Sequence, residues 1–292
     1  MKTWSTPVRA ERSNLIPCIS CGALNFKPLF TYKTAFSYSR CKICRLVQIN
    51  PQPINEDVIA RYSSVSGNEY LSYEIENEKT FLKLQLLALQ DAGFDKYEKT
   101  LLARVGEPSP SVLDVGCATG SLLVNLRERG WRVTGVEVSP CAEYAKEKYS
   151  LDVRTKPLED INFFTDSFDA ILASHLIEHL NNPRFFLSEA RKILKKDGRL
   201  FITTPNISGF QARLFGKYWR SAIFDHLYLF SKRTLTELLE KTGFKVESIS
   251  TWGGLAAGFA PSFIKKPVDY FAKKFGFGDV MILRAKKTDC NN

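Results

Sequence analysis

The sequence predicts an α/β protein with a doubly wound, mainly parallel sheet, preceded by a small zinc-binding module. From Ser111 onward, short apolar segments of strand length alternate with helical segments of 10–13 residues, which is typical of parallel sheets with helices on both faces. Four cysteines in two Cys-x2-Cys pairs lie within the first 50 residues. We therefore expect a zinc ribbon in residues 1–50, a connector with N-terminal helices in 51–109 and the α/β domain in 110–292.

The four cysteines have the spacing of a structural zinc site. A gap of two residues lets paired thiolates close on one ion, and two such pairs complete a tetrahedral shell. Disulfides are rare in the cytosol, so the disulfide alternative is weak. Because all four positions would be filled, no coordination site is left open for catalysis. The predicted ligands are Cys18, Cys21, Cys41 and Cys44.

The elements that follow are read from apolar periodicity and from helix start and stop residues. Ser139 with Pro140, and Ser231 with Gly243, are typical helix boundaries, and Gly198 is expected to end another helix. The predicted helices cover residues 75–92, 121–130, 139–150, 182–198, 231–243 and 268–275. The predicted strands cover residues 111–115, 131–138, 152–155, 168–174, 199–204, 244–251 and 279–285.

Composition and charge narrow the function classes. Hydrophobic residues make up 44% of the 292 residues and charged ones 25%, as in globular proteins. No apolar run approaches the roughly 20 residues of a membrane span, and the first 14 residues lack the apolar core of a secretory signal, so we expect a cytoplasmic protein. The net charge of +10 lies at the two ends, in residues 1–50 and 207–292. Basic ends suit nucleic acid, phosphorylated small molecules or an anionic membrane, or serve solubility alone.

The first strand–turn–helix has the features of a cofactor crevice. Asp114 ends the strand, and Gly116, Ala118 and Gly120 follow at alternating positions, where small residues let the backbone approach a ligand. Glu137 ends the second strand about twenty residues later, where an acid can accept bonds from both ribose hydroxyls. A carboxylate before the first glycine suits a ligand with a positively charged amino group better than a ligand with a pyrophosphate, whose negative charge it would repel.

The segments "LDVGCATG", "VEVSP", "SFDAILASHLIEHLNNP", "LKKDGRLFITTPN" and "HLYLFSKRTLTELLEKTGF" together resemble the class I S-adenosylmethionine-dependent methyltransferases, nearest to the small-molecule branch with the ubiquinone-type enzymes. The resemblance implies a Rossmann-like seven-stranded sheet and S-adenosylmethionine as cofactor. It also implies methyl transfer to oxygen or carbon of a small acceptor, such as a sugar, lipid-linked glycan or quinone-like precursor. The implied cofactor residues are Asp114, Gly116, Cys117, Ala118, Gly120, Glu137, Val138, Leu158, Glu159 and Ser174. Ala118 stands where many relatives have glycine.

All three histidines of the chain lie in the family-like segments, and a hydroxyl nucleophile needs a base near neutral pKa. His175, Glu178 and His179 also form the His-x-x-Glu-His string of a zinc peptidase class. That motif needs a long helix, whereas here it follows a strand directly and ends in an Asn-Asn-Pro turn. We therefore expect His175, His179 and His226 as candidate bases and Glu178 as a positioning group; position 175 is acidic in some relatives that use a divalent metal.

Two other functions remain open. The chain could methylate RNA and dock it on the basic zinc ribbon, although a base-methylation motif after the fourth strand and an RNA-binding aromatic pattern are both absent from the sequence. It could also be a zinc-stabilised binding protein without activity. The tail from Gly253 holds lysines beside phenylalanines, which would either contact a membrane surface or form a lid over the substrate pocket.

Overall fold

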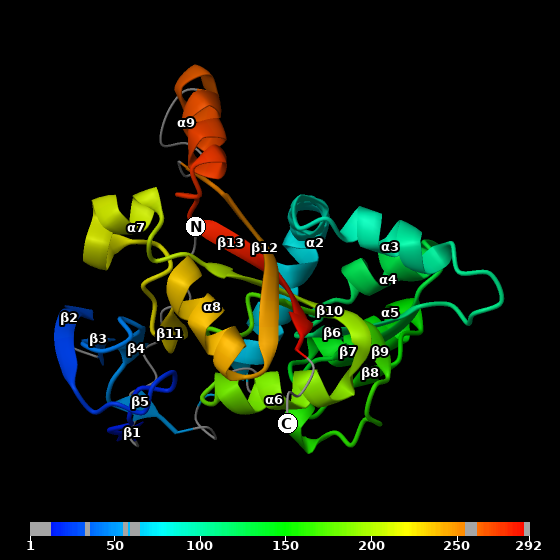
Figure 1. The fold of residues 1–292 in the computed structure, drawn as a ribbon, viewed down its shortest axis with the longest axis horizontal. Helices are drawn as coiled ribbons and strands as arrows, with labels where there is room; N and C mark the ends of the chain where they lie inside the picture. The colour runs from blue at the N-terminus through cyan, green and yellow to red at the C-terminus, as the bar shows by residue number, and fades with distance from the viewer. Residues whose placement is uncertain (1–12, 33–35, 55–57, 59–64, 255–261, 289–292) are drawn as a thin grey trace.

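A seven-stranded sheet forms the centre of the computed structural model, which describes residues 13–32, 36–54, 58, 65–254 and 262–288. The strand order is β12-β13-β10-β9-β6-β7-β8, and every pairing is parallel except those of β13 with β12 and β10 (Figure 1). This confirms the predicted Rossmann-like, mainly parallel sheet. The strands are β6 (Ser111–Val115), β7 (Arg132–Val136), β8 (Val153–Arg154), β9 (Phe168–Ser174), β10 (Leu194–Pro205), β12 (Phe244–Trp252) and β13 (Val280–Lys287).

Alternating side chains of the central strands pack on opposite faces of the sheet, as the two-residue period of a strand requires. On β9, Leu172 packs with one group of helices and Ile171 with another. The first face is covered by α2 (Val65–Asp91), α3 (Phe94–Leu102) and α4 (Ser121–Glu128), and the second by α6 (Pro183–Ile193) and α8 (Lys232–Lys241). The sheet is therefore doubly wound.

The predicted helix over 182–198 is too long at its C-terminal end. The helix α6 stops at Ile193, and Leu194 already pairs with Phe168 of β9. Leu194 is fully buried, and an ideal Cβ on Gly198 would lie 2.8 Å from its Cδ1. Tertiary strand pairing therefore overrides the helical pattern here. The capping prediction for α8 is confirmed, because the Ser231 hydroxyl accepts from the Thr234 amide at 3.1 Å.

The N-terminal module is a small sheet that residues from the main domain complete. Its strands are β2 (Phe26–Tyr32), β3 (Phe36–Cys41) and β4 (Val47–Ile49), and β11 (Tyr228–Leu229) pairs with β4 at the sheet edge. A further pair joins β1 (Ser13–Asn14) to β5 (Gln52–Pro53). Leu46 and Ile49 lie in the same core cluster as Leu227 and Phe230. The module and the main domain thus share one hydrophobic core.

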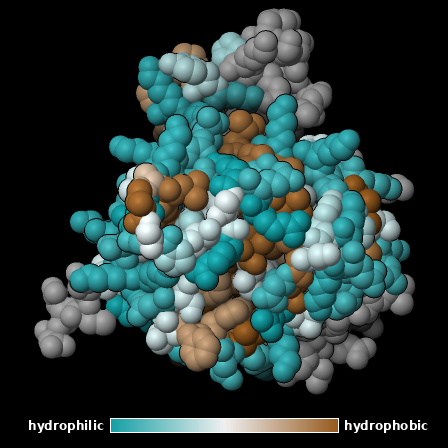
Figure 2. Space-filling view, turned by 90° about the vertical axis from the view of Figure 1, so that its right-hand side faces the viewer, coloured by the Kyte–Doolittle hydropathy of each residue, from teal (hydrophilic) through white to brown (hydrophobic). Residues whose placement is uncertain are grey.

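The other helices and turns in the described ranges lie at the ends of the sheet or against the elements that cover it. They are α5 (Cys141–Tyr149), which covers the β8 end of the sheet, α7 (Phe210–Phe215), the 3₁₀ turns η1 (Leu158–Asp160) and η2 (Gly216–Tyr218), and α9 (Ser262–Lys274). The helix α9 projects from the body (Figure 1). The side that faces right in Figure 1 is hydrophilic over most of its area, with hydrophobic side chains gathered near its middle (Figure 2). Within the described ranges, no helix is long and apolar enough to span a membrane.

Candidate functional site

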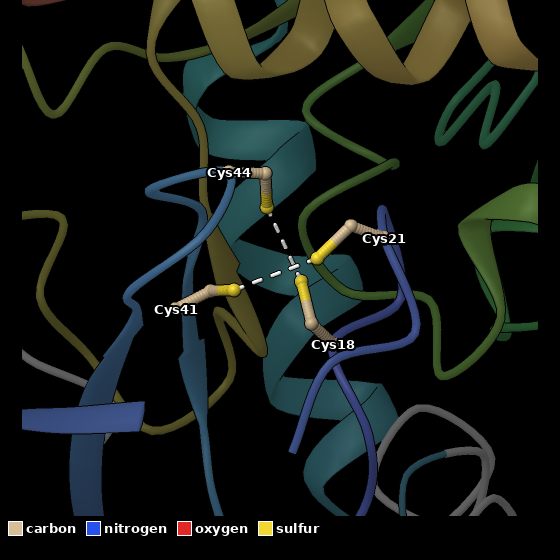
Figure 3. A group of neighbouring side chains, drawn as sticks. All are labelled: Cys18, Cys21, Cys41 and Cys44. Atoms are coloured by element: carbon tan, nitrogen blue, oxygen red, sulfur yellow. Dashed lines mark hydrogen bonds between the residues drawn. The ribbon is translucent and has the colours of Figure 1, made fainter. Parts of the chain in front are cut away.

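The four N-terminal cysteines converge on one point from two loops (Figure 3). The sulfurs of Cys18 and Cys44 lie 3.4 Å apart and those of Cys21 and Cys41 lie 3.5 Å apart, and all four lie within 4.8 Å of one another. A tetrahedral zinc site with bonds of about 2.3 Å has sulfur–sulfur edges of roughly 3.8 Å. The cysteines are unbonded thiols. The arrangement therefore fits a zinc ion held by four sulfurs.

Backbone hydrogen bonds and burial act in opposite directions on the pKa values of these thiols. Burial raises the pKa of Cys41, but hydrogen bonds from the backbone of Cys44 and Ile43 outweigh it and lower that pKa to about 7. Burial raises the pKa of Cys18. A metal ion would be needed to hold all four groups as thiolates, because like charges in one buried site repel.

The turn between β6 and α4 has the backbone of a ligand-binding loop. Gly116, Ala118 and Gly120 have φ values of 78°, 45° and 78°, in the left-handed region. Only Ala118 carries a side chain there, at a steric cost of roughly 1 kcal/mol. The Glu137 carboxylate accepts from the Ala118 amide at 3.0 Å and from the Ser139 amide at 2.8 Å. The turn is thereby fastened to the end of β7.

Asp114 lies beneath this turn and lacks a partner for its charge. Both its carboxylate oxygens are buried without a hydrogen-bond partner among the described residues. Burial and the neighbouring Glu137 raise the pKa of Asp114 to about 7. Glu74 of α2 behaves similarly, because burial and Glu137 raise its pKa to about 7. Three carboxylates at one end of a crevice fit a ligand that carries positive charge.

A cavity of about 1320 Å³ opens beside the turn and extends across the carboxyl ends of the strands. Gly116, Ala118 and Glu137 line one end, and Trp252 and Val280 line the other. The volume exceeds the range of about 300–1,000 Å³ that is usual for one small ligand, so two ligands can lie side by side.

The three histidines gather in the middle of this cavity around a buried carboxylate. Glu178 is fully buried and accepts from the Thr204 hydroxyl at 2.9 Å, and its other oxygen lies 3.3 Å from Nδ1 of His175. Burial opposes ionisation, but the hydrogen bond and the three nearby imidazoles lower the pKa of Glu178 to about 2. The rings of His179 and His226 meet edge to face at 4.7 Å. Donor atoms of Glu178, His179 and His226 lie within 4.8 Å of one another, a set that can also hold a divalent cation.

His226 is fixed as a neutral ring. Burial, and then the neighbouring His179, lower its pKa to about 3. Its Nδ1 lies 2.8 Å from the Ser221 carbonyl and therefore carries the proton, which leaves Nε2 as an acceptor. The backbone carbonyl of His226 lies 2.7 Å from the hydroxyl of Tyr38, on the N-terminal module.

Residues 88–249, more than half of the chain, match the model of a methyltransferase domain family. The chain belongs to the class I S-adenosylmethionine-dependent methyltransferases. This methyltransferase is 30% identical over 156 residues to the mitochondrial ubiquinone biosynthesis O-methyltransferase of Rattus norvegicus, covering 48% of the chain and 45% of that relative. It is 32% identical over 111 residues to the ubiquinone biosynthesis O-methyltransferase of Xanthomonas campestris, covering 36% and 46%. The chain thus matches just under half the length of these relatives.

Solved structures share the fold of the methyltransferase. A S-adenosylmethionine-dependent methyltransferase of Thermotoga maritima superposes with a TM-score of 0.55 at 22% identity, covering 80% of this chain and 99% of that one. One from Archaeoglobus fulgidus gives 0.52 at 20% identity, covering 74% and 99%. At these identities the likeness shows the fold alone.

The structure brings most of the predicted site residues of the methyltransferase to one cavity. The predicted residues on its wall are Gly116, Ala118, Glu137, Val138, Leu158, Glu159, Ser174, His175, His179 and His226. Asp114 and Glu178 are buried behind it, and Gly120 shapes the turn. The Cys117 thiol packs instead with Leu123 and Ala142 on the far side of the turn. The assignment of all these residues to the cofactor or to catalysis stays a prediction.

Sequence reasoning missed several side chains near the cavity. Tyr70 and Glu74 come from α2, Thr204 from the end of β10, Tyr38 from the N-terminal module and Arg220 from the segment after η2. Local motifs gave no signal for them, because their relevance depends on contacts between segments up to about 190 residues apart.

Proposed function

We propose that this protein transfers the methyl group of S-adenosylmethionine to oxygen or carbon of a small-molecule acceptor, such as a sugar, lipid-linked glycan or quinone-like precursor. The observation that carries the proposal is the single cavity, which joins the turn after β6 to the histidine cluster. The relatives named as ubiquinone biosynthesis O-methyltransferases support a small acceptor.

The acidic end of the cavity would hold the cofactor. Glu137 would accept from the ribose hydroxyls, Asp114 and Glu74 would neutralise the positive charge, and the wall formed by Leu158 and Glu159 would lie at the adenine. S-adenosylmethionine supplies a methyl group that is already strongly electrophilic. The protein therefore needs to hold a nucleophile in line and remove its proton.

His179 is the best-placed base. His179 and His226 both line the cavity, but the lowered pKa of His226, about 3, makes that ring a weak base. Glu178 is buried behind the cavity wall. The Glu178 carboxylate would stabilise the imidazolium that forms when His179 accepts the proton of an acceptor hydroxyl. His175 bonds Glu178 and fixes its orientation.

Purified protein with labelled S-adenosylmethionine and fractionated cell extract tests the reaction. Label in small polar or lipid fractions is the expected result. Label in RNA would favour an RNA methyltransferase that docks on the basic zinc module, and no label in any fraction would favour a silent binding protein. Replacing His179 with alanine should lower transfer by about 10²–10⁴-fold while the affinity for S-adenosylhomocysteine stays the same; unchanged transfer would remove His179 from the mechanism.

We also propose that Cys18, Cys21, Cys41 and Cys44 hold structural zinc within a module of residues 1–50, followed by the connector of 51–109 and the catalytic domain of 110–292. A four-thiolate site needs reduced cysteines, which supports the expected cytoplasmic location. Metal analysis should give one zinc per chain. Cys41→Ser should lose it, whereas Cys141→Ser, at a buried cysteine of α5, should retain it; retention in both variants would refute the site.

We also propose that the C-terminal tail, which includes α9, contacts a membrane surface peripherally. Tyr270, Phe271 and Phe275 are 60%, 52% and 57% exposed, beside Lys273 and Lys274. Exposed aromatic rings interspersed with lysines suit an anionic lipid surface. Flotation with vesicles of 30% phosphatidylglycerol in phosphatidylcholine should recover the protein, and Phe271→Ser should reduce that recovery; a protein that stays at the bottom of the gradient would favour a lid.

A further inference from the structure

Charge is divided between the two ends of the cavity. Glu74, Glu137, Glu159 and Asp160 line the end that we assign to the cofactor. The cations on the wall, Arg220 and Lys273, both lie at the opposite end, together with one carboxylate, Asp269. Such a separation matches a cationic group at one end and an anionic group at the other.

Arg220 is held in place by a buried carboxylate. Asp279, directly before β13, is fully buried, and one of its oxygens accepts from Nε of Arg220 at 2.7 Å. Its other oxygen accepts from the indole N–H of Trp219. The backbone of Asp279 is fixed as well, because its amide donates to the Gly253 carbonyl at 2.9 Å and its carbonyl accepts from the Asn206 amide at 2.8 Å. The arginine therefore rests on a rigid support.

The support leaves the outer edge of the guanidinium available. Asp279 is the only group that Arg220 bonds in the described part of the chain, and it engages Nε alone. The four N–H groups on Nη1 and Nη2 keep their capacity for a ligand, and the side chain is 42% exposed. A planar pair of N–H donors matches a carboxylate or phosphate.

The other charged groups at this end are already engaged. Lys273 pairs with Asp91 at 2.6 Å. Asp269 accepts from the Gly254 amide at 2.8 Å. Arg220 is therefore the cation best placed to bind an anion inside the cavity.

The position of Arg220 separates it from the cofactor. In the sheet, β13 lies three strands from β6, whose turn forms the cofactor end. Neighbouring strands are about 4.8 Å apart, so the two ends are roughly 14 Å apart. The histidine string follows β9, two strands or roughly 10 Å from β13. A carboxylate of the cofactor itself would lie too far away to reach Arg220.

We propose that Arg220, supported by Asp279, forms an anion-binding subsite for a carboxylate or phosphate of the methyl acceptor, roughly 10 Å from the atom that is methylated. The inference rests on the proposed function, because it assigns this end of the cavity to the acceptor. It narrows the acceptor class to molecules that carry a carboxylate or phosphate at the end remote from the methylated atom. A neutral sugar or an unsubstituted catechol would leave the subsite unused.

Binding of octanoate, octyl phosphate and 1-octanol to protein saturated with S-adenosylhomocysteine tests the subsite by calorimetry. These probes share one chain and differ in the terminal group, and the two anions distinguish a carboxylate from a phosphate source. Hydrogen bonds to charged groups should make at least one anion bind about 10- to 100-fold more tightly than octanol. Arg220→Gln should abolish this preference and leave octanol binding unchanged.

Two further variants keep the test decisive. Arg220→Lys, which retains the charge but loses the planar pair of donors, should keep part of the preference even where Arg220→Gln is unstable. Arg213→Gln, at a cation that lies over the ring of Phe277 outside the cavity wall, should keep all of it. Equal binding of the three probes, or an equal loss in Arg213→Gln, would overturn the proposal. Weaker S-adenosylhomocysteine binding in Arg220→Gln would instead assign Arg220 to the cofactor, whereas a wild-type protein that fails to bind S-adenosylhomocysteine refutes the proposed function itself.

Discussion

Tyr38→Phe is the sharpest test of whether the N-terminal module shapes the cavity that holds the three histidines. Tyr38 is fully buried, and its hydroxyl lies 2.7 Å from the carbonyl oxygens of both Ile223 and His226. The Ile223 carbonyl keeps a second donor, the His226 amide at 3.1 Å. Removal of the hydroxyl therefore leaves the His226 carbonyl short of a donor, while the ring and its packing remain.

The expected cost in stability is modest. A buried carbonyl left without a donor costs about 1–3 kcal/mol, which corresponds to a loss of roughly 2–5 °C in the unfolding temperature of a chain this size. The larger effect should be local, because the peptide that carries His226 loses its tether to β3. The His226 ring meets His179 at 4.7 Å, so both rings should shift.

The chain has only three histidines, so their imidazole signals can be followed separately by NMR. Tyr38→Phe should displace the signals of His226 and His179. The control is Tyr97→Phe, which removes a hydroxyl that donates to the Asp169 carbonyl at 2.7 Å, at the opposite end of β9 from His175. It should cost similar stability and leave the histidine signals in place. Identical histidine spectra in wild type and Tyr38→Phe, or equal displacements in both variants, would refute the coupling.

Two other predictions concern the site. Ala118→Gly should raise the free energy of unfolding by up to about 1 kcal/mol, because φ at 118 is 45°, where a side chain is strained. The control Ala173→Gly, in an extended strand, should lower the free energy of unfolding. A lower free energy of unfolding in both variants, measured by chemical denaturation, would show that the backbone at Ala118 is not strained. The pKa of His226 is about 3 against an ordinary 6.5, so the unfolded chain binds a proton that the folded chain does not as the pH falls from 6.5 towards 3. Each unit by which the pH falls in that window should therefore lower the free energy of unfolding by about 1.4 kcal/mol. In His226→Asn the free energy of unfolding should depend less on pH by that amount. Parallel plots of the free energy of unfolding against pH for wild type and variant would show that His226 is not buried as a neutral ring.

Much of the fold could be predicted because its signals are local. The strands over 111–115 and 168–174 follow from apolar runs, and the start of α8 follows from Ser231. The end of α6 could not be predicted, because Leu194 belongs to a helical pattern yet pairs with β9. Local pattern cannot weigh a contact with a strand some 26 residues away.

In the candidate site, too, some features could be predicted from local sequence. The spacing of Cys18, Cys21, Cys41 and Cys44 predicted a cluster that the structure brings together, and the turn around Gly116 lies on the cavity wall as expected. The sequence predicted His175, His179 and His226 as candidate bases, and the structure places all three on the cavity wall near Glu178. Their role in catalysis stays a prediction.

The sequence by itself determined most of the elements, the small-residue turn after β6 and the spacing of the four thiols, because periodicity, small residues and short spacings are read within a few residues of the chain. Only the tertiary structure decided that Tyr38 bonds the peptide of His226, that β11 completes the sheet of the N-terminal module, and that Asp279 holds Arg220 at the far end of the cavity. These contacts join residues 59 to 188 positions apart. They exist because burial brings distant segments into one core, and buried polar groups then need partners wherever the fold places them.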